Sequence, residues 1–176
     1  MRSFAFLILL SVFSACNNEP ENDDINKTFF PIEGNIKAEL KKIDSLPVTI
    51  LKYSTEKGVS DTSIFSREAF RKIAEQLYTP DISSPELKKY YRESVFMDNT
   101  INTVTMSYTT TEKEPAIRKI EVMIHPESEE VRSIYVEKQN GQTLFKMVWT
   151  PGKNLQVITI PDGEPENIKT EKYSWQ

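Results

Sequence analysis

The segment SIYVEKQNGQTLFKMVW, residues 133–149, decides the fold. Apolar side chains recur at alternate positions on both sides of Asn140-Gly141, the strongest turn signal in the chain. A two-residue loop there would place Val136 opposite Phe145, Ile134 opposite Met147 and Arg132 opposite Trp149. A slip of one residue would move the apolar side chains of one strand to the wrong face. The sequence therefore predicts an antiparallel hairpin.

The same alternation extends to both sides of this hairpin. Across the loop at 151–154, we expect Phe145 and Met147 to face Ile160 and Ile158. Residues 103–109 and 119–125 also alternate between apolar and polar positions. Residues 168–175 add a last strand, with Tyr173 and Trp175 on one side. The second half of the chain is thus predicted to be an antiparallel meander of five to six strands.

The first half is dominated by helical spacing. A helix is predicted over 35–45, because Ile36, Leu40 and Ile43 fall on one of its faces. A hairpin over 48–65 follows, and helices are predicted to begin at Ser66 and at Ser84-Pro85-Glu86. We expect one α+β domain over 28–176, in which the N-terminal helices pack on one face of the meander.

The opposite face of this sheet has a mixed composition. It is expected either to be solvated or to line a shallow groove. The residues assigned to it are Thr103, Thr105, Glu121, His125, Tyr135, Leu144, Lys146 and Val148.

Composition narrows the classes of function. The chain has 22 basic and 26 acidic residues, interspersed, which disfavours nucleic acid as a partner. Its five glycines are isolated at turns, so no phosphate-binding loop is recognised. One histidine and one cysteine provide no zinc-binding pattern. No cofactor, metal site or catalytic residue is predicted.

Some polar residues keep two interpretations. His125 could be a general base or pH sensor, or an ordinary exposed residue at a strand end. Glu127, Glu129 and Glu130 could bind calcium or form a solvated hairpin tip. The same alternatives apply to Asp162-Gly163-Glu164, and a hydrolase built on a carboxylate pair also remains open.

The N-terminus has the layout of an export signal. Arg2 precedes an apolar run over 4–13, which is too short to span a bilayer, and small residues follow. Phe13-Ser14-Ala15-Cys16 resembles the lipobox of bacterial lipoproteins, with Phe13 in place of the usual Leu. The resemblance covers residues 1–16 and implies cleavage before Cys16 and lipid attachment to Cys16.

This resemblance divides the chain into a signal peptide (1–15), an acidic flexible tether (16–27) and the domain (28–176). Asn17 after the cysteine resembles lipoproteins that reach the outer membrane. The acids that follow resemble surface-export signals, so both a periplasmic and a surface position are open.

Two functions follow from these expectations. The first is a membrane-anchored envelope lipoprotein with a non-enzymatic binding or accessory role and another envelope protein as its partner. The alternative is a carrier that holds an apolar ligand or lipid in a cavity between sheet and helices. Phe145, Met147 and Trp149 would then line that cavity.

Overall fold

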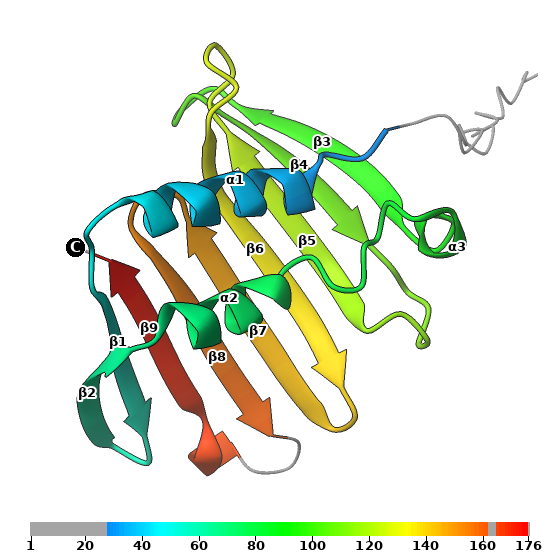
Figure 1. Cartoon of the computed structure of the whole chain (residues 1–176). Helices are drawn as coiled ribbons and strands as arrows, with labels where there is room; N and C mark the ends of the chain where they lie inside the picture. The colour runs from blue at the N-terminus through cyan, green and yellow to red at the C-terminus, as the bar shows by residue number, and fades with distance from the viewer. Residues whose placement is uncertain (1–27, 162–164, 176) are drawn as a thin grey trace, which may run out of the picture.

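The fold is dominated by one antiparallel sheet (Figure 1). The computed structural model describes residues 28–161 and 165–175, and nine strands in these residues form the sheet in the order β2-β1-β9-β8-β7-β6-β5-β4-β3. The strands are β1 (Ile50–Glu56), β2 (Val59–Phe65), β3 (Arg92–Asp98), β4 (Thr103–Thr109), β5 (Ile117–Ile124), β6 (Val131–Asn140), β7 (Thr143–Thr150), β8 (Asn154–Pro161) and β9 (Lys169–Trp175). The helices are α1 (Ile32–Ser45), α2 (Arg67–Glu75), α3 (Pro85–Lys88) and a 3-10 turn, η1 (Pro165–Asn167).

The predicted fold class, α+β with a meander of five to six strands, is wrong. The chain is mostly β-structure, and its single sheet takes in the β1–β2 hairpin from the first half of the sequence. This hairpin joins the sheet because β1 pairs with β9, the last strand of the chain. Strand β3 was also missed, since Ser94–Met97 are exposed on both faces and therefore do not alternate.

The register of the β6–β7 hairpin differs from the prediction by two residues. Val136 pairs with Met147, and Asn140 pairs with Thr143, so the loop is Gly141-Gln142. Gly141 has a positive φ of 58°, as the first loop residue of a type II′ turn requires. A shift of two residues keeps every side chain on its predicted face, so the alternation of apolar residues could not reveal it.

The predicted pairing of β7 with β8 is also wrong, by one residue. Met147 pairs with Val157 and Phe145 with Thr159, rather than with Ile158 and Ile160. Leu155 and Val157 are consequently the buried residues of β8.

The core lies between the sheet and helices α1 and α2, which cross the same face of the sheet (Figure 1). Helix α1 begins at Ile32, three residues before the predicted start, and buries Ile32, Ile36, Leu40 and Ile43. Burial of each such side chain contributes roughly 1.5–3 kcal/mol. Helix α2 is capped by Ser66, whose hydroxyl accepts from the backbone N–H of Ala69 at 3.2 Å, as the sequence predicts.

Aromatic rings fill the centre of this core. Phe70 of α2 lies 6.1 Å from Trp149 and 5.5 Å from Trp175, measured between ring centroids. Tyr173 and Trp175 lie on one side of β9, as the sequence predicts, and both are buried. Tyr91 donates a hydrogen bond from its hydroxyl to the Ile117 carbonyl at 2.7 Å, and burial raises its pKa to about 12. Helix α2 is thus fixed to the sheet by packing around large rings.

Candidate functional site

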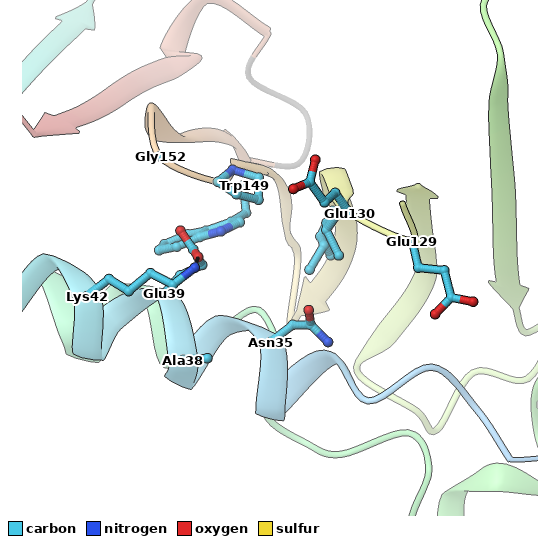
Figure 2. Close-up of a pocket in the computed structure, with 11 residues that line it drawn as sticks. Asn35, Ala38, Glu39, Lys42, Glu129, Glu130, Trp149 and Gly152 are labelled. Carbon is cyan, nitrogen blue, oxygen red and sulfur yellow. Dashed lines mark hydrogen bonds and ion pairs between the residues drawn. The ribbon is translucent and has the colours of Figure 1, made fainter. Parts of the chain in front are cut away.

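A groove of about 480 Å³ opens between α1 and one end of the sheet (Figure 2). One wall is the polar side of α1, and the facing wall is formed by two turns, β5–β6 and β7–β8. Apolar side chains of β6 and β7 lie at its base. The lining residues are Asn35, Ala38, Glu39, Lys42, Glu129, Glu130, Val131, Ile134, Trp149, Pro151 and Gly152.

The charges around the groove are mainly acidic. Lys42 pairs with Glu39 at 2.5 Å, and its pKa is raised mainly by the hydrogen bond with Glu39 and then by the negative charges of Glu39 and Glu130. Glu130 therefore acts across the groove on α1. The lining contains three carboxylates, Glu39, Glu129 and Glu130, and one lysine, so the groove favours a ligand that combines a positive charge with an apolar part.

The β5–β6 turn has a defined backbone. The His125 N–H donates to the Glu130 carbonyl, and the Glu129 N–H donates to the His125 carbonyl, each at 2.9 Å. Glu129 has a positive φ of 55°, which is uncommon for a residue with a side chain. These bonds hold Glu129 and Glu130 on the β6 side of the turn.

His125 takes part in closing this turn. Its Nδ1 lies 3.4 Å from the N–H of Glu127, and its Nε2 lies 3.5 Å from Nδ2 of Asn102. One ring nitrogen thus contacts the turn of His125 itself, and the other contacts the β3–β4 turn. These contacts favour the interpretation of His125 as a structural residue of the turn.

Among residues 28–161 and 165–175, no group of three or more His, Cys, Asp or Glu side chains is arranged to hold a metal ion. Glu127, Glu129 and Glu130 are exposed in the β5–β6 turn, as expected for a solvated hairpin tip. Asp162-Gly163-Glu164, the signal peptide, Cys16 and the tether lie outside the described residues. Within the described part of the chain, no helix is long and apolar enough to cross a membrane.

The residues assigned to a carrier cavity pack into the core. Met147 and Trp149 are each only 1% exposed, and Trp149 lies 5.4 Å from the Trp175 ring. Phe145 is partly buried against the same cluster. Only Trp149 among the three also lines the groove.

Neither α1 nor α2 covers the outer face of the sheet (Figure 1). Thr103, which was assigned to this face, is buried. Its hydroxyl accepts a hydrogen bond from Nη1 of Arg132 at 2.8 Å. Glu121 pairs with Lys119 at 2.8 Å, and the hydroxyl of Tyr135 donates to Glu137 at 2.9 Å. Part of the polar composition predicted for this face is therefore organised in pairs.

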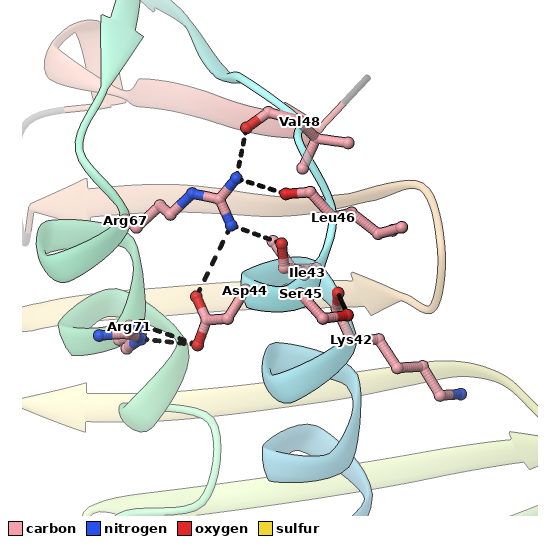
Figure 3. A network of polar contacts seen from close by, with 8 residues as sticks. All are labelled: Lys42, Ile43, Asp44, Ser45, Leu46, Val48, Arg67 and Arg71. Atoms are coloured by element: carbon pink, nitrogen blue, oxygen red, sulfur yellow. Dashed lines mark hydrogen bonds and ion pairs between the residues drawn. The ribbon is translucent and has the colours of Figure 1, made fainter.

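The position of α1, which forms one wall of the groove, is fixed by arginines from α2 (Figure 3). Nη2 of Arg67 donates to the carbonyls of Leu46 and Val48 at 2.8 and 2.7 Å, and Nη1 donates to the Ile43 carbonyl. Arg71 pairs with Asp44 at 2.7 Å. A guanidinium thus satisfies backbone carbonyls at and beyond the C-terminus of α1.

Sequence reasoning identified only part of this groove. It placed Glu129 and Glu130 at a hairpin tip and the segment 151–154 in a loop. It did not single out Asn35, Ala38 or Glu39, which are on the polar side of a predicted amphipathic helix. The missing information was which turns this helix faces, and that depends on the order of the strands.

No family model matches the chain, and no curated protein or solved structure is significantly similar to it.

Proposed function

We propose that the chain is a cell-envelope lipoprotein, anchored through Cys16, whose domain binds another envelope protein without catalysing a reaction. The observation that carries the binding role is the open groove beside α1, which has an apolar base and an acidic rim. The occupant that fits it is an extended segment of the partner with a basic side chain next to an apolar one. The lipobox resemblance of residues 13–16 supports the anchor.

The location follows from the same N-terminal residues. Lipid on Cys16 would hold the domain at a membrane, and the acidic tether would separate the two. Asn17 favours the outer membrane, and the domain would face the periplasm or the exterior.

The anchor is tested by comparing the full chain with a Cys16→Ala variant, both expressed in a bacterial host. We expect the wild-type protein to partition with membranes and to carry a lipid-shifted mass. The variant should lose both properties. A soluble, unmodified wild-type protein would refute the anchor.

The groove is tested by cross-linking the full chain in envelope membranes and identifying its partners by mass spectrometry. Ala38→Arg would fill the groove with a bulky cation, and Glu130→Lys would reverse the charge at its rim. Both should reduce recovery of a specific partner at least about tenfold, a loss of about 1.4 kcal/mol. Glu68→Lys, on the exposed side of α2, is the matched control and should not change recovery.

Two outcomes contradict the binding role. One is that no partner is recovered reproducibly. The other is that every partner is recovered equally with Ala38→Arg, Glu130→Lys and Glu68→Lys. Either would leave the groove without a binding role, whatever the result for Cys16.

A further inference from the structure

Strand β3 forms one edge of the sheet. It pairs with β4 on one side, and on its other side lies no strand of residues 28–161 or 165–175. Such an edge presents a row of unpaired backbone N–H and C=O groups, which are a template for pairing with another strand. Natural proteins usually protect long edge strands with charges, prolines or bulges.

The middle of this edge is apolar instead, with charges only toward its two ends. Among the described residues, nine large hydrophobic side chains are exposed, and four of them lie within positions 95–101. They are Val95, Phe96, Met97 and Ile101, at 61%, 66%, 39% and 57% exposure. The opposite edge strand, β2, differs because its exposed Val59 and Ile64 are separated by Ser60-Asp61-Thr62-Ser63. An exposed apolar edge is typical of an interaction site.

We propose that two copies of this chain pair through β3, antiparallel to each other, about a two-fold axis at Val95. In this register Val95 faces Val95 of the partner subunit, and Phe96 faces the partner's Ser94. Arg92 faces the partner's Asp98, and the symmetry repeats that contact. The two sheets become one continuous sheet, with the helices of both copies on the same face.

Charge selects this register. With a two-fold axis normal to the sheet, side chains that face each other must lie on the same face of the sheet. Because side chains alternate between faces, the nearest alternative registers are shifted from this one by two residues. A shift one way places Arg92 opposite the partner's Phe96, and a shift the other way places Asp98 opposite the partner's Ser94. Arg92 is exposed and has no ion pair among the described residues. Only the Val95-centred register gives both charges an opposite partner.

The point where the tether joins the domain is compatible with this pairing. Phe29 lies 4.6 Å from the ring of Tyr108, whose hydroxyl accepts a hydrogen bond from the Phe30 N–H at 2.9 Å. Tyr108 is in β4, directly opposite Glu93 of β3. Both copies would therefore enter their domains close to the axis and on the same face. Two tethers could reach one membrane, although the dimer does not depend on the anchor.

The affinity is expected to be modest. A seven-residue strand buries less surface than the 1,200–2,000 Å² (roughly) of a standard stable interface. The dimer should therefore dissociate on dilution in solution. Attachment of both copies to a membrane would raise their effective concentration.

Single cysteines introduced into the detergent-solubilised full chain test the pairing. Opposed residues of paired strands have Cβ atoms about 4.5–5.5 Å apart, so Val95→Cys should give a disulfide-linked dimer on mild oxidation. Val59→Cys, on the other edge and at 72% exposure against 61% for Val95, is the matched control and should remain monomeric. The wild-type chain reports any contribution of Cys16.

A charge reversal tests the register. Arg92→Asp, added to Val95→Cys, would place an acid opposite the partner's Asp98 at both symmetry-related contacts. It should lower the yield of cross-linked dimer about tenfold. Lys153→Asp makes the same charge change in an exposed turn and should leave the yield unchanged. Circular dichroism verifies that each variant is folded.

Three results would overturn the proposal. Val95→Cys could remain monomeric or cross-link only to a different protein. Val59→Cys could cross-link to the same extent as Val95→Cys. Arg92→Asp could leave the cross-linked fraction unchanged. None of these results bears on the groove beside α1, because the proposed function uses another surface.

Discussion

At the scale of single residues, Glu171 is a carboxylate held by two lysines. Its side chain is only 13% exposed and forms ion pairs with Lys52 at 2.7 Å and Lys169 at 3.0 Å. Burial alone would raise its pKa, but the hydrogen bonds and charges of the two lysines outweigh that effect and lower the pKa. Lys52 also lies 5.5 Å from the ring centroid of Phe65. The cluster therefore joins β1 to β9 beside the aromatic core.

Glu171→Gln should destabilise the domain by about 1–3 kcal/mol, because it removes charge-assisted hydrogen bonds and leaves mostly buried Lys52 without its partner. The measurement is denaturant unfolding at pH 7. Glu68→Gln is the control, since Glu68 and Lys72 are both exposed and their pair contributes about 0.5 kcal/mol or less. Equal effects of the two substitutions would contradict the assignment.

The same cluster predicts a pH dependence. The folded-state pKa of Glu171 is lowered, so its contribution is complete above the unfolded value of about 4.3 and is lost as the pH falls through the folded value. The difference in stability between wild type and Glu171→Gln should accordingly shrink below about pH 4. A difference that stays constant down to pH 2 would show that charge is not its cause.

At the scale of elements, α1 depends on a side chain of another helix. Arg67 of α2 donates to carbonyls of Ile43, Leu46 and Val48, which follow the last turn of α1 or belong to it. Lysine cannot replace it, because an ammonium lacks the planar set of donors that reaches several carbonyls at once. This contact also fixes the wall of the groove.

Arg67→Ala and Arg67→Lys should each lower the free energy of unfolding by about 2–3 kcal/mol, since they leave partly buried carbonyls unsatisfied. Arg71→Ala, which removes an exposed ion pair with Asp44, should cost about 1 kcal/mol or less. Thermal unfolding of the three variants distinguishes these cases. Full retention of stability by Arg67→Lys would mean that charge alone matters at this position.

At the scale of the whole molecule, the C-terminal strand connects two parts of the sheet. Strand β9 lies between β1 and β8, so the β1–β2 hairpin reaches the rest of the sheet only through it. Tyr173 and Trp175 of the same strand belong to the aromatic core.

Truncation after Ile168 should therefore prevent folding, as observed by loss of the sheet signal in circular dichroism and by rapid proteolysis. Trp175→Ala should cost about 3–5 kcal/mol through the cavity that it leaves. Lys172→Ala, on the exposed side of β9, should change stability by about 0.5 kcal/mol or less. A truncated chain with wild-type thermal stability would contradict the central role of β9.

Local pattern predicted the parts of the molecule that depend on neighbouring residues. The buried side of α1, the bounds of β2 at Val59–Phe65 and the cap at Ser66 agree with the structure. The alternation of residues 103–109 matches β4, and that of residues 119–125 overlaps β5, which runs from Ile117 to Ile124. Hydrophobic periodicity and capping act over a few residues, so the sequence carries this information directly.

Only the tertiary structure decided the strand order, the two-residue shift at Asn140-Gly141 and the place of β3 at an edge. A shift of two residues leaves the faces unchanged, and an edge strand exposed on both faces has no alternation to detect. The groove between α1 and the turn at Glu129-Glu130 also could not be predicted from the sequence, because its walls come from segments far apart in the chain. Local sequence thus determined the elements and their buried sides, while long-range pairing determined which surfaces meet and which remain open.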